Sequence, residues 1–354
     1  MKKISMNELQ PGMTLARTII NENLIVVLAE NTLLSKAHIT RLKFLGINEV
    51  YIKDDYDLSP QYFIVSSLIN RSHAFVSDYD EVLKFAEEIF VTTTKTKEVP
   101  ISKLKNTIQS SLSPLIKESG VIDYLYELKH MNNTIYNHSL RVAILAGVLA
   151  KWLLYDDAKI RDITLAGFLH DIGKTQIDNA IIEKNIENLS ATEYESYIQH
   201  TLSGYHLIAN NSDISENVKH ALLQHHEKMD GTGVPFNSSG DEINEYAKII
   251  AIVDLYDHIT TEREGFLKQT PFSAIEKITN EMFTTLDPKY CMPFLLNVQQ
   301  SFIGSAVMLS NKSRGTIIQY PKDYAALPII KTTTNEIIDL NFHSDLKIIE
   351  YNPQ

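Results

Sequence analysis

Histidines and aspartates that can bind a transition metal recur between positions 138 and 254 of the chain. Neutral imidazole and carboxylate are the nitrogen and oxygen donors that Fe, Mn, Zn and Ni accept. One of the carboxylates, Asp171, can bridge two ions, and paired metals are a recurrent solution for phosphodiester hydrolysis. The predicted metal ligands are His138, His170, Asp171, His200, His225, His226 and Asp254.

Hydrophobic periodicity predicts that two of these side chains face inward. In a helix expected over residues 137–153, His138 is in register with an apolar stripe that includes Val142. Asp254 lies four residues after Ile250 on the inward stripe of another expected helix. A buried aspartate is costly unless it is paired or bound to a metal. Taken alone, His138 also fits an ordinary core histidine, so the prediction depends on the whole set.

A second helix is expected over residues 161–172, and Gly173 is a natural stop at its C-terminal end. Lys174 follows Asp171 by three residues and lies on the same side if the turn continues. Its ammonium group can hold a substrate phosphate oxygen or protonate a leaving alkoxide. A solvated lysine is the alternative.

The adjacent histidines His225 and His226 are expected to close a helix just before a loop. Side chains about 100° apart around a helix can still converge on one ion at the helix end. His200 is the weakest member of the set, because a polar histidine on a helix surface is its ordinary explanation.

Composition indicates a soluble globular protein, since 354 residues with 44% hydrophobic content can bury a large core. The apolar runs are too short to span a membrane and the start does not resemble a signal peptide, so a cytoplasmic location is expected. The single cysteine, Cys291, cannot form an intrachain disulfide, which fits a reducing compartment. A formal charge of −11 argues against binding DNA or RNA.

The chain is expected to be mainly α-helical and to contain four segments. Residues 1–60 form a small mixed α/β module. Residues 61–119 form a helical connector that is broken between Thr92 and Pro100 and can supply a homodimer surface. Residues 120–300 form the chemical domain, and residues 301–354 form a β-rich extension.

From about Ile122 to Asn297, ordered motifs resemble the HD-GYP branch of the HD phosphohydrolase superfamily. The motifs are Asn137-His138-Ser139, His170-Asp171-Ile172-Gly173-Lys174, His200-Thr201 with Gly204, His225-His226-Glu227, Asp230-Gly231-Thr232-Gly233-Val234-Pro235 and Ile250-Ala251-Ile252-Val253-Asp254-Leu255-Tyr256-Asp257. The resemblance implies an all-helical HD-type domain that hydrolyses cyclic di-GMP to linear pGpG, with slower cleavage to GMP. It also implies two or three metals, commonly Fe or Mn, although Zn and Ni share the same donors.

Residue by residue, the resemblance makes His138, His170, Asp171 and Asp254 ligands of the first metal. Asp171 then bridges to a second metal, which is held by His200, His225 and His226. The resemblance further implies that the bound metals would lower the pKa of a water that attacks one phosphorus of the substrate, and that Lys174 would assist the leaving oxygen. Arg263 corresponds to a family arginine that binds substrate phosphate.

Three positions depart from the family pattern. Val234 stands where the Gly-Tyr-Pro tyrosine is expected, and Glu264 follows Arg263 where the family has proline. Thr134 replaces a glutamate of members with three metals, which favours two metals here. Two other functions therefore remain open. One is a receptor or interaction protein that binds cyclic di-GMP or a partner without cleavage, and the other is HD chemistry on another cyclic dinucleotide.

Overall fold

The computed structural model describes residues 2–6, 8–17, 19–20, 26–28, 32, 34–52, 60–118, 120–128, 134–182, 184, 186–262, 267–321 and 327–352. The chain divides into two compact units, one of Met1–Phe75 with Phe302–Gln354 and one of Val76–Ser301. The finer division into four segments stays a prediction. No helix among the described residues combines the length and apolar character needed to cross a bilayer.

The N-terminal part of the first unit mixes short strands with one helix, as the sequence predicts. Strand β1 (Lys2–Ser5) pairs antiparallel with β4 (Glu49–Ile52), and β2 (Ile19–Ile20) pairs with β3 (Val26–Leu28). Helix α1 (Lys36–Phe44) begins at a capping box in which Ser35 and His38 satisfy each other's backbone amides. A small apolar core holds these elements together.

The C-terminal part of this unit is one antiparallel sheet with strand order β8-β7-β6-β5-β9. Its strands are β5 (Ala306–Leu309), β6 (Arg314–Gln319), β7 (Ile329–Thr332), β8 (Ile337–Asp339) and β9 (Ile348–Asn352). A short 3-10 helix η5 (Leu340–Phe342) follows β8. The sequence patterns missed β9, which pairs with β5 and packs its Tyr351 ring 5.1 Å from that of Phe302.

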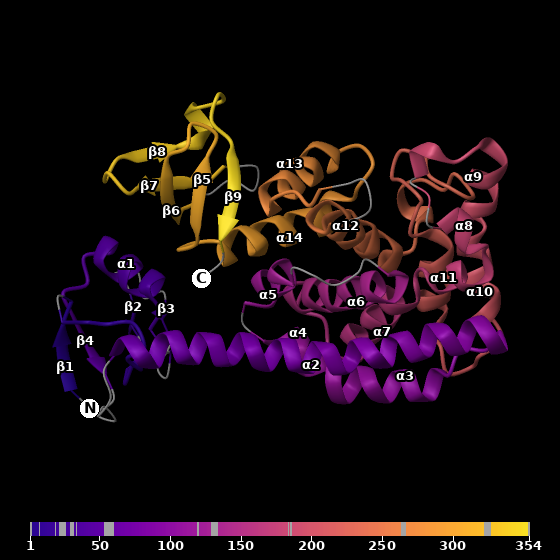
Figure 1. Cartoon of the computed structure of the whole chain (residues 1–354), viewed down its shortest axis with the longest axis horizontal. Helices are drawn as coiled ribbons and strands as arrows, with labels where there is room; N and C mark the ends of the chain where they lie inside the picture. Colours follow the sequence, from indigo (N-terminus) through magenta and orange to yellow (C-terminus); the bar gives the residue numbers. More distant parts are fainter. Residues whose placement is uncertain are drawn as a thin grey trace. The chain divides into compact units, whose positions relative to one another are not determined.

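Among its described residues, the second unit consists of helices and the turns and loops that connect them (Figure 1). Its longer helices are α2 (Pro60–Thr96), which starts in the first unit, α6 (Ile135–Trp152), α7 (Asp157–Leu169), α12 (Glu245–Thr260), α13 (Pro271–Glu281) and α14 (Pro288–Ser301). The shorter ones are α3 (Ile101–Thr107), η1 (Ile108–Leu112), α4 (Ser113–Lys117), α5 (Val121–Glu127), η2 (Ile172–Gln176), α8 (Asn179–Ile182), η3 (Ile186–Asn188), α9 (Ala191–Ile198), α10 (His200–Ile208), α11 (Glu216–Gln224) and η4 (Gly240–Glu242).

Helix α6 is the centre of this unit. Every residue from Asn137 to Ala150 is buried, because α7, α12, α4 and α14 all pack against the helix (Figure 1). The side chain of Thr134 accepts a hydrogen bond from the backbone of Asn137 and caps the N-terminal end. The predicted inward stripe is therefore only part of a helix that is enclosed on all sides.

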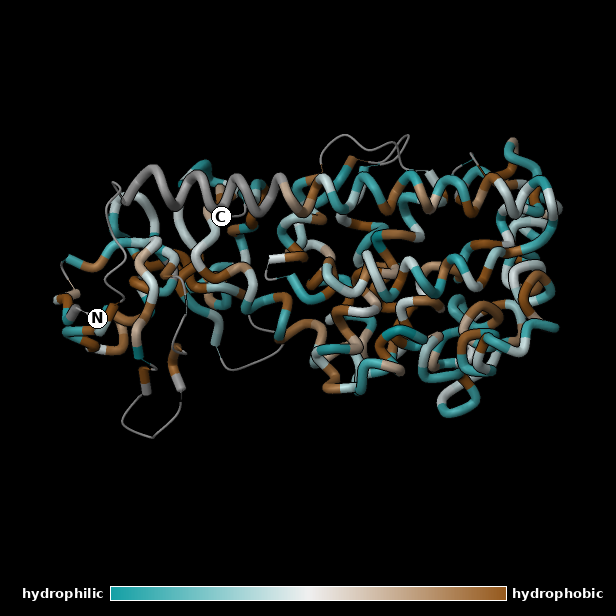
Figure 2. Tube along the Cα trace, turned by 90° about the horizontal axis from the view of Figure 1, so that it is seen from below, coloured by the Kyte–Doolittle hydropathy of each residue, from teal (hydrophilic) through white to brown (hydrophobic). Residues whose placement is uncertain are grey.

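Helix α2 continues four residues beyond the predicted break at Thr92. The break begins instead at Lys97, which has a φ of 62°. The threonines are compatible with the helix because Thr94 and Thr96 donate hydrogen bonds to the carbonyls four residues earlier. Hydrophobic and hydrophilic residues alternate along the coloured part of the α2 trace in Figure 2. The ring centroids of Phe90 in α2 and Phe168 in α7 lie 5.9 Å apart.

Gly173 has a different role from the predicted helix stop. Helix α7 ends at Leu169, and Gly173 lies inside η2 without a left-handed backbone. A Cβ atom at this position would lie 1.9 Å from the carbonyl oxygen of His200 and 2.4 Å from the amide nitrogen of Gly204. The missing side chain is therefore what allows η2 to contact α10.

The substitution Gly173→Ala should reduce the free energy of unfolding by more than Gly204→Ala. The added methyl group at 173 meets rigid backbone, whereas at 204 the nearest atom lies 3.3 Å away. Overpacking of this kind costs roughly 1–3 kcal/mol. Urea denaturation of both variants measures the difference, and equal midpoints would contradict this account.

Candidate metal centre

The seven predicted ligands come from five helices and converge in the second unit. His138 lies in α6, His170 and Asp171 follow α7, His200 begins α10, His225 and His226 follow α11, and Asp254 lies in α12. His200 has no exposed surface, so the explanation as a surface histidine is wrong. The pair at 225 and 226 closes its helix before the 230–240 loop, as predicted.

Backbone carbonyls fix the orientation of three of the imidazoles. The Nδ1 atoms of His170, His200 and His225 lie 2.7, 2.6 and 3.0 Å from the carbonyl oxygens of Gly167, Tyr197 and Leu222. A carbonyl can only accept, so each Nδ1 carries the proton and each Nε2 keeps a lone pair. This is the arrangement of metal-binding histidines, in which the far nitrogen is held by an outer hydrogen bond.

The Nε2 atoms of four histidines lie near the two oxygens of Asp171, two near each oxygen. Oδ1 lies 3.4 Å from His200 and 3.8 Å from His225. Oδ2 lies 3.4 Å from His170 and 3.6 Å from His138. One carboxylate therefore lies between two groups of histidines, and its role as a bridging metal ligand stays a prediction.

The Nε2 atoms of His170, His200 and His225 and the oxygens of Asp171 are all hydrogen-bond acceptors, so they cannot satisfy one another. Among the described residues, His170 Nε2, His226 Nε2 and Asp171 Oδ1 are buried and have no hydrogen-bond partner. Buried polar atoms are normally satisfied, and burying them unpaired costs roughly 1–3 kcal/mol each. A divalent cation among the lone pairs removes this cost. The donors fall into groups able to hold an ion, one of which is Asp171, His200, His225 and His226.

Burial keeps three of the imidazoles neutral. It lowers the pKa of His200 to about 3 and that of His226 to about 4, and it holds the pKa of His225 well below its usual range. Burial alone would raise the pKa of the Asp171 carboxyl, but Lys174 and the surrounding histidines hold it well below its usual range. At neutral pH these groups are therefore in the protonation state that binds metal.

His138 differs because two carboxylates flank it. Its Nδ1 lies 2.8 Å from Asp257 Oδ2, and its Nε2 lies 3.1 Å from Asp254 Oδ1 without the alignment of a hydrogen bond. Burial acts to lower the pKa of His138, but Asp254 and Asp257 raise it to about 9. The space between His138 and Asp254 thus favours a cation, either a proton or a metal.

The sequence interpretation gave no role to Asp257, which organises this side of the site. Its carboxylate accepts from Arg141 at 2.6 and 3.0 Å and from the Nδ1 of His138. Burial acts to raise the pKa of Asp257, but Arg141 and His138 hold it below its usual range. The available signal was its spacing, one helical turn after Asp254.

His258 was also missed. The structure groups it with His138 and Asp254, while His138 also groups with His170 and Asp171. The predicted first-metal set of His138, His170, Asp171 and Asp254 is therefore divided between two overlapping groups. His258 follows Asp254 by one helical turn, and no motif drew attention to it.

Lys174 lies within the cluster, and its predicted role in substrate binding stays a prediction. Its Nζ is 2.6 Å from Asp171 Oδ2 and 5.1 Å from the centre of the Tyr197 ring. Burial acts to lower the pKa of Lys174, but Asp171 raises it, so the ammonium stays charged. Arg263 and Glu264 lie outside the described residues.

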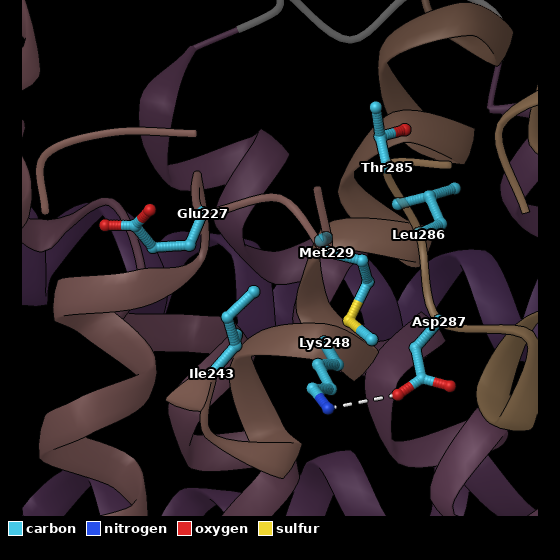
Figure 3. Close-up of a pocket in the computed structure, with 8 residues that line it drawn as sticks. Glu227, Met229, Ile243, Lys248, Thr285, Leu286 and Asp287 are labelled. Carbon is cyan, nitrogen blue, oxygen red and sulfur yellow. Dashed lines mark ion pairs between the residues drawn. The ribbon is translucent and has the colours of Figure 1, made fainter. Parts of the chain in front are cut away.

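Glu227 anchors the loop that carries the altered Gly-Val-Pro motif. Its buried carboxylate accepts from the backbone amides of Phe236 at 2.6 Å and Ser238 at 3.0 Å. Figure 3 shows Glu227 among the residues that line a small pocket, which include Lys248 and Asp287, an ion pair at 3.1 Å. None of the predicted metal ligands lines this pocket, so it is separate from the cluster.

A family model described as HD domain matches residues 106–290, more than half of the chain. The chain belongs to the HD-domain family. The predicted membership of the HD superfamily is thereby confirmed. The match covers all seven predicted metal ligands and His258.

Curated relatives of this HD-domain chain include two bacterial phosphodiesterases. A cyclic di-GMP phosphodiesterase of Pseudomonas aeruginosa is 31% identical over 218 residues, covering 62% of this chain and 51% of the relative. A 3′3′-cGAMP-specific phosphodiesterase of Vibrio cholerae is 32% identical over 152 residues, covering 43% of this chain and 33% of the relative. The chain thus spans about half of the length of the first relative and about a third of the length of the second.

A solved structure shares the fold. Bd1817, described as a HDG"Y"P protein from Bdellovibrio bacteriovorus, aligns with a TM-score of 0.53 over 84% of this chain and 99% of its own. The identity is 15%, so the likeness concerns the fold alone. The predicted mainly helical HD-type architecture is confirmed.

The substitution Asp257→Asn should weaken binding of Mn²⁺ by about ten- to a hundredfold, because it disturbs the partner that orients His138. Asp241→Asn, on the exposed η4, is the matched control and should bind like the unchanged protein. Calorimetric titration of the folded apo-proteins measures both affinities. Unchanged affinity in folded Asp257→Asn would show that this contact has no part in metal binding.

Proposed function

We propose that the chain is a metal-dependent phosphodiesterase that hydrolyses cyclic di-GMP to linear pGpG, with slower cleavage to GMP. The observation that carries the proposal is the position of Asp171, whose two oxygens face separate groups of buried imidazoles. The curated relative named as a cyclic di-GMP phosphodiesterase supports the choice of substrate.

The donors fit two divalent ions, with Fe or Mn expected first and Zn or Ni also compatible with imidazole and carboxylate. Asp171, His200, His225 and His226 would hold one ion. His138, His170, Asp171 and Asp254 would hold the other. When bound, such ions supply Lewis acidity at phosphoryl oxygens and lower the pKa of water.

The protein groups around the donors have distinct tasks in this proposal. Asp257 and the three backbone carbonyls orient the imidazoles so that their lone pairs point inward. Lys174 remains a charged donor beside Asp171, where it can hold a phosphate oxygen and support the leaving 3′ oxygen. Arg263 is proposed as a second phosphate ligand, as its fork can engage two oxygens.

A second candidate is hydrolysis of another cyclic dinucleotide. The relative named as specific for 3′3′-cGAMP is as similar in identity as the cyclic di-GMP relative, although over fewer residues. Val234 also removes an aromatic ring from the loop beside the cluster. The metal chemistry is shared by the two candidates, so only the contacts to the bases separate them.

Turnover should disappear in His225→Ala, because this substitution removes a donor from the group around Asp171. The proteins are purified without oxygen, analysed for metal, and incubated with cyclic di-GMP and Mn²⁺ or Fe²⁺. His220→Ala, on the exposed face of the same helix segment, is the matched control and should retain turnover. A metal-loaded protein that binds cyclic di-GMP in calorimetry but yields no product would instead be a receptor.

Comparison of cyclic di-GMP with 3′3′-cGAMP should give a kcat/KM at least about tenfold higher for cyclic di-GMP, a ratio that pocket contacts can supply. Chromatography of the products under identical metal loading measures both values. A reversed ratio would establish the second candidate and leave the metal site unaffected.

A further inference from the structure

His258 lies at the partly exposed end of the histidine and aspartate cluster. Its side chain is 32% exposed, compared with 15% for Asp254 and 11% for His138, whereas His170, Asp171, His200 and His225 have at most 1%. His138, Asp254 and His258 thus form an outer group whose side chains keep some contact with solvent.

The separations within the outer group suit a metal ion. Asp254 Oδ1 lies 3.1 Å from His138 Nε2 and 3.4 Å from His258 Nδ1. Donors that bind one first-row ion at about 2.0–2.2 Å lie roughly 3.0–3.6 Å apart when they are neighbours in its shell. The one ligand atom offered by each of the three residues lies within 4.8 Å of the others.

A hydrogen bond from outside the outer group fixes the ring orientation of His138. Asp257 occupies the Nδ1 of His138, so the Nε2 atom of that ring is left to face Asp254. Asp254 Oδ1 is buried and has no hydrogen bond among the described residues, although two imidazole nitrogens are near it. The His138 and His258 rings meet edge to face, with centroids 5.4 Å apart.

We propose that His258 is a further metal ligand, which binds a divalent first-row transition metal together with His138 and Asp254 at the outer end of the site. The inference rests on the metal-dependent function proposed above and adds a residue to its donor set. Two imidazoles and a carboxylate favour Mn²⁺, Fe²⁺, Co²⁺ or Zn²⁺ over Mg²⁺ and Ca²⁺, which prefer oxygen ligands.

A structural role for His258 is the competing explanation. Asp254 and His258 are separated by four residues on α12, and such pairs can form a simple ion pair on a helix. A structural pair predicts a change in thermal stability and no change in metal content. A ligand predicts a change in metal content even where the variant is fully folded.

The test uses Co²⁺, because its visible absorption reports the donors around it. Full-length unchanged protein, His258→Ala and His258→Gln are freed of metal, titrated with Co²⁺, and analysed for bound metal after dialysis. His258→Gln can still hydrogen bond to Asp254 but lacks the imidazole nitrogen. His220→Ala is the control for loss of an exposed histidine.

Both His258 variants should lose one equivalent of Co²⁺, or bind one equivalent at least about tenfold more weakly, with reduced visible absorption. Loss of an equivalent would indicate a separate ion, and weaker binding would indicate an ion shared with the other ligands. Unchanged equivalents, affinities and spectra in folded variants would overturn the proposal. If the unchanged protein binds no Co²⁺, the proposed function fails as well, whereas intact binding and turnover in all variants would reject only the role of His258.

Discussion

Asp171 is a buried carboxylate faced by imidazole nitrogens whose protons point the other way. The hydrogen bonds from the Nδ1 atoms of His170, His200 and His225 to backbone carbonyls leave lone pairs on the side of the carboxylate, where Lys174 supplies a positive charge. Such a collection of acceptors is unfavourable in a dry interior. A cation bound among the lone pairs removes this unfavourable arrangement. The surrounding helices hold the lone pairs in the positions that such a cation requires.

The helical bundle meets this requirement through close packing and outer hydrogen bonds. Helix α6 is enclosed on all sides, so its histidine has a fixed position relative to α7 and α12. The absence of a side chain at Gly173 brings η2 against the first residue of α10. Asp257, which accepts from Arg141, fixes the ring of His138, although the two residues are 119 positions apart in the sequence. Pre-organisation of this kind reduces the reorganisation needed when a metal binds.

Recognition of the substrate is a separate property of the same domain. The 230–240 loop is anchored by Glu227, whose carboxylate accepts hydrogen bonds from two backbone amides of the loop. This loop carries Val234 where the HD-GYP pattern has tyrosine. The two curated relatives act, by name, on different cyclic dinucleotides. A common metal centre combined with variable loops is the usual way in which one fold serves several substrates.

The sequence by itself determined the HD-type helical class, the seven candidate metal ligands and the helix ends at which most of them lie. These features follow from local periodicity, helix-ending patterns and motif order. Only the tertiary structure decided which nitrogen of each histidine faces inward, that Gly173 permits a contact with α10 rather than ending a helix, and that β9 completes the C-terminal sheet. It also brought Asp257 and His258 to His138. Local patterns describe which face a residue presents, but not which distant residue it meets, because that depends on how whole helices pack.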